Sequence, residues 1–214
     1  MSATLAHCIH RTGRTVFAVA AGGLWLAVVL LGFYRITAYE LRRSPAVGAP
    51  RMWPAESRLP HSPSHSTLLV FLHPRCPCSR ATLDELGRVL HGHRDVQATA
   101  VFVRPDGLPE AWEQSELWHT ASQIPGLEKR VDAGGEEARR FDVTASGQTL
   151  IYGPDGRLAF EGGLTATRGH YGRNSASDAA LDVLKAAPAS PLEFPTYGCP
   201  LLDEPQSCCK VKKP

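Results

Sequence analysis

The amino-acid sequence predicts a three-layer α/β domain with a mixed sheet, preceded by one N-terminal transmembrane helix. Between residues 66 and 188, short apolar segments alternate with amphipathic ones, and the series closes with a hairpin and a last helix. This order is typical of helices packed on a sheet. Upstream, Val16 to Tyr34 is uncharged and almost wholly apolar, close to the length of about 20 residues that crosses a bilayer.

Charge and cysteine content restrict the classes of function. The chain has 214 residues, and its 23 lysine and arginine residues nearly balance 21 acidic ones, giving a net charge of +2. Because nucleic-acid binding leaves a basic footprint, we expect no nucleic-acid partner. The six cysteines are too few for a disulfide scaffold, and their grouping favours local chemistry or a single staple. They are Cys8, Cys76, Cys78, Cys199, Cys208 and Cys209.

The N-terminal part is predicted to attach the domain to a membrane. We assign residues 1–14 to a short tail, residues 15–36 to a transmembrane signal anchor, and residues 37–65, rich in Pro, Ser, Gly and Ala, to a flexible linker. Arginines flank the span in similar numbers on both sides, so the orientation rests on its position near the N-terminus and on cysteines that suit an oxidising compartment. The domain is therefore expected on the outer, periplasmic or extracytoplasmic side. A cleaved signal peptide, the alternative, would place it there too.

The first strand and helix of the domain are the best defined. Leu68 to Leu72 is an apolar run that predicts a buried strand over residues 67–72, and a His-Pro-Arg turn ends it. A helix is expected from Pro77 to about residue 91, with Gly92 as its left-handed cap. Its apolar face carries Leu83, Leu86 and Leu90.

The later elements follow from shorter patterns. The turn sequence Gly153-Pro154-Asp155-Gly156 predicts the hairpin, and Arg104-Pro105 ends the second strand. Further strands are expected at residues 96–103, 127–131, 149–152 and 158–161. Further helices are expected at residues 109–122, with Trp112, Leu117 and Trp118 on one side, at 136–141, and at 175–187, with Ala180, Leu181, Leu184 and Ala187 inward. Residues 189–214 form a cysteine-containing C-terminal tail.

Cys76 stands where the first strand gives way to the first helix. With Pro77 at the first helical position, Cys76 becomes the expected N-cap, beside the unpaired N–H groups of the first turn. Those donors and the helix dipole stabilise a thiolate, so its pKa should fall and the sulfur should be reactive. The alternative is an inert buried cysteine.

This strand–helix order, with a cysteine at the helix start, resembles thioredoxin. The interval from Phe71 to Cys76 matches the family's interval from aromatic residue to first cysteine, and the resemblance covers residues 66 to 187. Within that superfamily the chain resembles the membrane-anchored RedB-like proteins, through residues 73–79, 162–170 and 197–199. The resemblance implies a thioredoxin-like fold and thiol–disulfide exchange, with protein or small-molecule thiols and disulfides as partners and no required cofactor.

The sequence departs from the thioredoxin pattern twice. The family has C-x-x-C, whereas here Ser79 occupies the second cysteine position and Cys78 falls between, giving C-x-C-S. The family's cis-proline would fall near Ser146-Gly147-Gln148, which contains no proline. That proline keeps metals from the cysteines in the family, so its absence leaves metal binding more open.

For thiol–disulfide exchange, Cys76 is the expected nucleophile, Cys78 the resolving thiol or a second ligand, and Ser79 a hydrogen-bond donor to the thiolate. A disulfide across one intervening residue closes a small, strained ring, so a tail cysteine is the second option for resolution. The tail candidates are Cys199, Cys208 and Cys209, which could instead form a structural staple.

Further residues are expected to line the site. His73 and Arg75 belong to the turn before Cys76. The loop after the hairpin should return to the cysteine end of the sheet, bringing Arg168 to lower a thiolate pKa and His170 to move a proton, although such a loop can also be a solvated connection.

Two other functions remain open from the residues. Cys76, Cys78 and His73 could bind a soft ion such as Cu(I), whereas zinc sites usually have a wider cysteine spacing. The chain could also be a non-catalytic, membrane-tethered binding module that keeps the fold without the chemistry.

Overall fold

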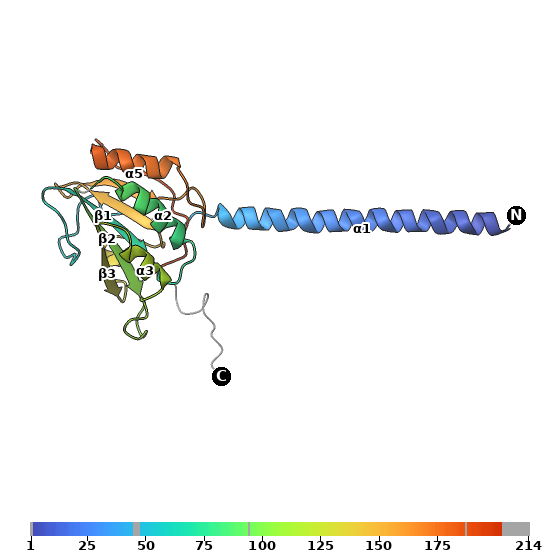
Figure 1. Cartoon of the computed structure of the whole chain (residues 1–214), viewed down its shortest axis with the longest axis horizontal. Helices are drawn as coiled ribbons and strands as arrows, with labels where there is room; N and C mark the ends of the chain where they lie inside the picture. Colours follow the sequence, from blue (N-terminus) through green and yellow to red (C-terminus); the bar gives the residue numbers. More distant parts are fainter. Residues whose placement is uncertain (1, 45–47, 94, 187, 203–214) are drawn as a thin grey trace. The chain divides into compact units, whose positions relative to one another are not determined.

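The computed structural model describes residues 2–44, 48–93, 95–186 and 188–202 (Figure 1). The chain divides into two compact units, Met1–Leu41 and Arg42–Pro214. The first consists of helix α1 (Ser2–Glu40). Its segment Val16–Glu40 is long and apolar enough to cross a membrane, a property that membrane anchors and signal sequences share. The helix continues past the predicted span into the start of the predicted linker.

The second unit contains a six-stranded mixed sheet in the order β3-β2-β1-β4-β5-β6. The first three strands run parallel, β4 is antiparallel to β1, β5 is antiparallel to β4, and β6 is parallel to β5. The strands are β1 (Ser66–Leu72), β2 (Val96–Arg104), β3 (Leu127–Ala133), β4 (Gln148–Tyr152), β5 (Leu158–Gly163) and β6 (Leu192–Glu193).

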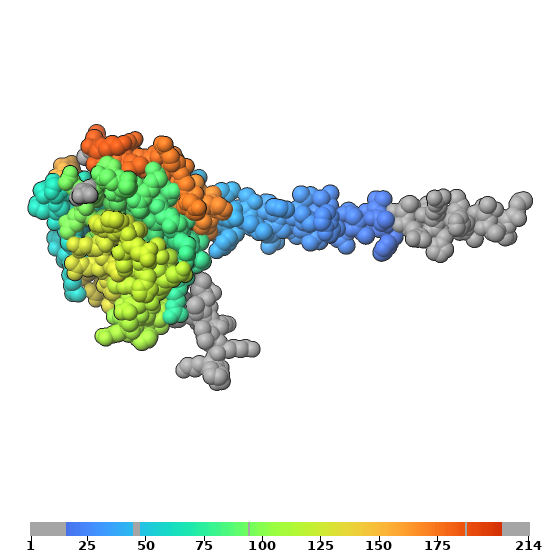
Figure 2. Space-filling model, viewed as in Figure 1, coloured from blue at the N-terminus to red at the C-terminus, as the bar shows by residue number. Residues whose placement is uncertain are grey.

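Three helices cover one face of the sheet. They are α2 (Ser79–Leu90), α3 (Glu116–Ser122) and α5 (Ser175–Lys185). The predicted apolar face of α2 packs with alternate residues of β1, such as Leu68 and Val70, in one buried cluster. Figure 2 shows this side as a continuous surface, with the residues of α5 in orange above those of α2 in green and of α3 in yellow-green.

The opposite face of the sheet is covered by less regular structure. Leu69, Phe71 and Tyr152 pack there with Phe141, which follows the short helix α4 (Glu136–Arg140). α4 is too short to cover this face of the sheet by itself. Chain segments from both ends of the second unit complete the layer. The strand order and the three layers confirm the predicted thioredoxin-like fold class.

The segment predicted as a flexible linker differs from that prediction in its second half. Ala49 is buried, the Trp53 ring packs edge-on against Phe141 and Tyr152 at centroid distances of 5.0 and 5.2 Å, and the Tyr152 hydroxyl donates to Pro50 O at 2.9 Å. The five-residue α4 cannot bury this sheet face alone, so the linker's apolar residues do part of it. The C-terminal tail likewise packs on the domain as far as residue 202, with Leu201 buried.

Two helices begin later than predicted. α2 begins at Ser79 because a turn occupies residues 77–78. α3 begins at Glu116, since Ala111 has a left-handed φ of 67° and Ser115 caps the helix by accepting from Trp118 N–H. The predicted hairpin turn and the left-handed Gly92 after α2 are confirmed.

Candidate active site

Three cysteine sulfurs meet at the start of α2. The Sγ atoms of Cys76, Cys78 and Cys199 all lie within 4.8 Å of one another. Cys76 is buried, whereas Cys78 and Cys199 are half-buried, and all three are free thiols. Two of them come from the connection between β1 and α2, and the third comes from the far end of the sequence.

A tight turn holds Cys76 in place. Its N–H donates to His73 O at 3.0 Å, and its own carbonyl accepts from Ser79 N–H at 3.1 Å. The helical N-cap is Cys78, two residues after the position expected from the sequence. Cys76 therefore precedes α2 by a turn, and the donors that surround its sulfur are mostly side chains.

Cys199 reaches the site because the chain near it pairs with the segment that leads into β4. Ser146 N–H donates to Cys199 O at 2.8 Å, and Leu201 N–H donates to Thr144 O at 2.9 Å. The approach requires glycine at position 198, where an added Cβ would lie 1.8 Å from Ser146 O. This is the region where the thioredoxin pattern places a cis-proline; no peptide bond of the described segments is cis.

The Cys76 sulfur is surrounded by donors. Its pKa is lowered far below that of an ordinary thiol, first by the hydrogen bond from the Cys199 side chain and then by one from Cys78. Burial opposes this shift, while the Ser79 hydroxyl and the Cys199 N–H add to it. Cys76 is therefore the thiolate of the cluster, which is the charge state that nucleophilic attack requires.

The other two sulfurs remain protonated and act as donors. The pKa of Cys199 is raised because its S–H donates to Cys76 and interacts with Cys78, and burial adds to the shift. For Cys78, a hydrogen bond from Cys199 lowers the pKa, but the bond to Cys76, burial and the Cys76 charge together raise it. Cys76 is therefore the first of the three thiols to ionise.

A pair of serines continues the hydrogen bonding away from Cys76. Ser79 Oγ lies 2.6 Å from Ser146 Oγ, which accepts from His73 N–H at 2.7 Å. Each hydroxyl has one hydrogen, and Ser79 uses its own for Cys76. Ser146 must then donate to Ser79. The sequence marks Ser146 only as part of the stretch without a cis-proline, and its place in this hydrogen-bonded pair follows from the fold.

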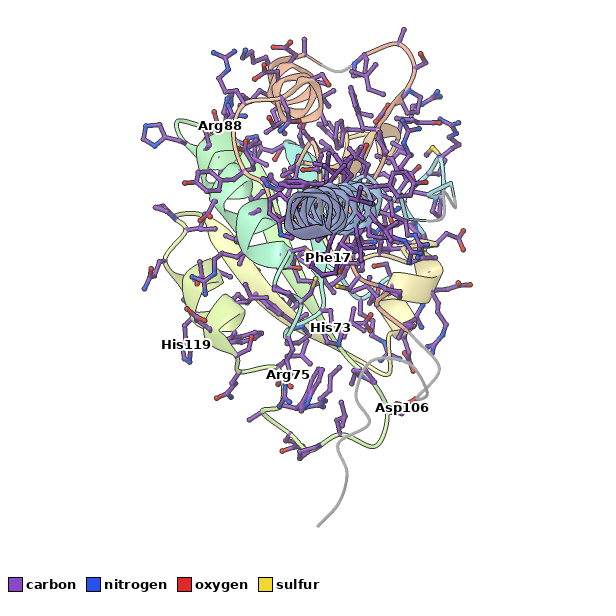
Figure 3. The ribbon with its side chains drawn as sticks, turned by 90° about the vertical axis from the view of Figure 1, so that its right-hand side faces the viewer. Phe17, His73, Arg75, Arg88, Asp106 and His119 are labelled. Atoms are coloured by element: carbon purple, nitrogen blue, oxygen red, sulfur yellow. The ribbon has the colours of Figure 1, made fainter. Side chains whose placement is uncertain are left out.

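His73 and Arg75 turn toward an aromatic residue. The His73 ring packs edge-on against Trp112 at 5.4 Å, its Nδ1 accepts from Arg75 N–H at 3.2 Å, and the Arg75 guanidinium lies 4.9 Å from the centre of the Trp112 ring. His73 and Arg75 are labelled in Figure 3, below Arg88, which lies in the last turn of α2. The sequence suggested His73 as the third possible metal ligand beside Cys76 and Cys78. In the structure the third member of the sulfur cluster is Cys199.

The loop after β5 brings one of its two predicted residues to the sulfurs. Arg168 lies close enough to Cys78 for its charge to lower that thiol's pKa. His170 is exposed, and its Nδ1 lies 2.8 Å from Arg168 O and 3.0 Å from Thr167 Oγ1. Buried Glu85 of α2 fixes this loop by accepting from Gly172 N–H at 2.5 Å. The remaining candidates, Cys208 and Cys209, lie outside the described residues.

Structural similarity supports the fold. No family model and no curated protein sequence matches the chain. An uncharacterized conserved protein of Geobacillus kaustophilus aligns with a TM-score of 0.58 at 20% identity, over 77% of this chain and 99% of its own. A hypothetical protein of Sinorhizobium meliloti aligns with a TM-score of 0.58 at 16% identity, over 74% and 96%. At these identities the similarity shows the fold alone.

Proposed function

We propose that the chain is a membrane-anchored, thioredoxin-like protein of the RedB-like type that performs thiol–disulfide exchange, with Cys76 as the attacking thiolate. The observation that carries the proposal is the buried Cys76 sulfur, which has the sulfurs of Cys78 and Cys199 within 4.8 Å. Hydrogen bonds from these two residues and from Ser79 lower its pKa. Three donors on one buried sulfur stabilise its charge more than an inert core cysteine would need.

The chemistry follows from that charge. The thiolate attacks one sulfur of a partner disulfide, forming a mixed disulfide with Cys76 and releasing the partner's other sulfur as a thiolate. Arg168, placed beside Cys78, offers a positive charge close to the departing sulfur. Protein or small-molecule thiols and disulfides are the partners that fit this step, and no cofactor takes part in it.

The apolar helix supplies the proposed location. Residues 15–36 would hold the protein in a membrane, with the domain on the outer side, where an oxidising environment supplies disulfides. A signal peptide cleaved after the apolar segment would leave the same domain in the same compartment.

The test compares two cysteine variants of the full chain. Cys76→Ser should abolish both insulin-type disulfide reduction and oxidative refolding activity, because a serine hydroxyl stays protonated at neutral pH. Cys8→Ser, in the predicted N-terminal tail, should retain both. Unchanged activities in Cys76→Ser would exclude the enzymatic proposal and favour a non-catalytic tethered module.

A second candidate function is binding of a soft ion, and the three-sulfur cluster favours it. Cys76, Cys78 and Cys199 present three soft donors within 4.8 Å, the ligand type that selects Cu(I). Binding would displace the protons of Cys78 and Cys199, so affinity should fall as the pH decreases. The wild type should then bind one Cu(I) under reducing conditions, and both Cys78→Ser and Cys199→Ser should bind it weakly, whereas His73→Ala should bind as the wild type does.

A further inference from the structure

The C-terminal segment of residues 192–202, here named the strap, passes over the Cys76 sulfur. We propose that Cys199 is the resolving cysteine, and that the strap carrying it opens to admit a partner disulfide and closes again to release the product. This inference rests on the proposed thiol–disulfide exchange and adds to it both the second thiol and the way a substrate reaches the first.

Burial of Cys76 requires such a movement. The residue is 1% exposed, yet attack on an external disulfide needs direct contact between two sulfur atoms. Cys199 covers it with two groups, since both its S–H and its N–H donate to the Cys76 sulfur. The residue that stabilises the thiolate is therefore also one that shields it.

The strap is anchored on both sides of Cys199, by Phe194, which stacks on Phe160 at a centroid distance of 5.7 Å, and by Leu201, whose N–H donates to Thr144 O at 2.9 Å. The part that has to move is the short stretch between these two anchors. Beyond the two-residue strand β6, Ser146 N–H donates to Cys199 O, and Ser44 Oγ lies 3.2 Å from Gly198 O and 3.3 Å from Gly198 N. Leu201, at 1% exposure, is its buried anchor. Segments with few buried apolar contacts open at a lower free-energy cost than the core does.

The electrons balance over two steps. Cys76 thiolate attacks the partner disulfide, and one partner sulfur leaves as a thiolate. Cys199 then loses its proton to solvent and attacks the Cys76 sulfur, forming a Cys76–Cys199 disulfide and expelling the second partner sulfur. Two protein thiols have been oxidised and one disulfide reduced to two thiols; a dithiol protein would restore the starting state by the reverse exchange.

Geometry favours Cys199 over Cys78 for the second step. Cys78 is fixed at the N-cap of α2 with helical dihedrals, and a bond from it to Cys76 would close a strained ring across one residue. Cys199 sits on a separate segment that can adjust its position. Its sulfur already lies within 4.8 Å of the Cys76 sulfur.

Disulfide mapping tests the resolving role. The reduced full chain is treated with glutathione disulfide, digested with trypsin and with a protease that cuts before Asp203, and analysed by mass spectrometry with fragmentation. The second cut separates Cys199 from Cys208 and Cys209. A Cys76–Cys199 bond is expected in the wild type, with persistent Cys76–glutathione in Cys199→Ser.

The possible results separate the two proposals. A bond from Cys76 to another cysteine, or a stable Cys76–glutathione adduct in the wild type, would overturn the resolving role of Cys199 while leaving exchange itself intact. No adduct and no disulfide at Cys76 would reject the proposed function as well.

Alkylation rates test the strap. The alkylation is carried out at pH 9, where even an ordinary thiol is largely ionised. Cys76 of the wild type should react with iodoacetamide at least about tenfold more slowly than Cys76 of the Leu201→Ala variant, because loss of a buried leucine loosens the strap. The matched control Leu192→Ala removes a partly exposed leucine from the same strap and should keep the slow rate. Equal rates in both variants, or wild-type alkylation as fast as that of a free cysteine peptide, would refute the shielding.

Discussion

Gly198→Ala is the substitution for which the structure gives the sharpest expectation. The added Cβ would lie 1.8 Å from the Ser146 carbonyl oxygen and 3.2 Å from its nitrogen. These are backbone atoms, which cannot rotate away as the end of a side chain can. The segment around residue 198 must therefore move off the chain that leads into β4.

The cost of that movement can be estimated from what it breaks. It separates Ser146 N–H from Cys199 O and Leu201 N–H from Thr144 O, two hydrogen bonds of 2.8 and 2.9 Å, each contributing about 1 kcal/mol. It also exposes Leu201, at a cost of about 2 kcal/mol. We expect the free energy of unfolding to fall by about 4 kcal/mol.

Urea unfolding of the full chain in detergent measures this difference. With a slope of about 2 kcal/mol per molar urea, the midpoint should fall by about 2 M. Gly48→Ala is the matched control, since no atom lies within 4 Å of a Cβ placed there, and its change should stay within about 0.5 kcal/mol. If the two variants unfold together, the close packing of the C-terminal segment on Ser146 is not a source of stability.

Substitutions at Cys199, Glu161 and Tyr152 test the electrostatics and the packing. Cys199→Ala should return the pKa of Cys76 toward that of an ordinary thiol, whereas Cys199→Ser keeps a hydrogen-bond donor and should leave the pKa low. The ultraviolet absorbance of the thiolate, measured against pH, distinguishes the two variants. Equal titration curves would contradict the hydrogen-bond argument. Because the Cys76 pKa is lowered on folding, its contribution to stability is complete above the unfolded pKa of about 8.5 and is lost as the pH falls toward the folded value. Burial raises the pKa of Glu161, so stability should increase as the pH falls through that raised value toward the ordinary value of about 4.3, and Glu161→Gln should flatten this part of the stability curve. Tyr152→Phe leaves Pro50 O without its donor and should cost about 1 kcal/mol; no loss in urea unfolding would mean that the bond adds no net stability.

The sequence predicted those parts of the fold that local patterns determine. The apolar run of β1, the hairpin turn and the leucine face of α2 all depend on residues that are neighbours in sequence, and each is found where expected. The start of α2 was misplaced by two residues because a proline after a cysteine is compatible both with a helix start and with the turn that occurs here.

The remaining parts depend on distant contacts. The composition of residues 37–65 is typical of a linker. Trp53 packs against Phe141 because the sheet face beside Phe141 would otherwise be left uncovered. Cys199 could be named as a candidate, but its place beside Cys76 follows from the path of the last segment across residues 144–146. Ser146 stands out in the sequence only as part of the stretch without a cis-proline, and its role follows from the fold, which places its hydroxyl 2.6 Å from that of Ser79.

The position of Cys199 near the C-terminal end has a consequence for biosynthesis. A chain made from its N-terminus presents Cys76 and Cys78 long before Cys199 and Leu201 exist. Until those residues arrive, the Cys76 thiol lacks the donor that contributes most to its ionisation, and its pKa stays closer to that of a free cysteine. The Cys76 thiol of the nascent chain is thus comparatively unreactive, and the nucleophile is created only when the segment that carries Cys199 has been synthesised and has docked.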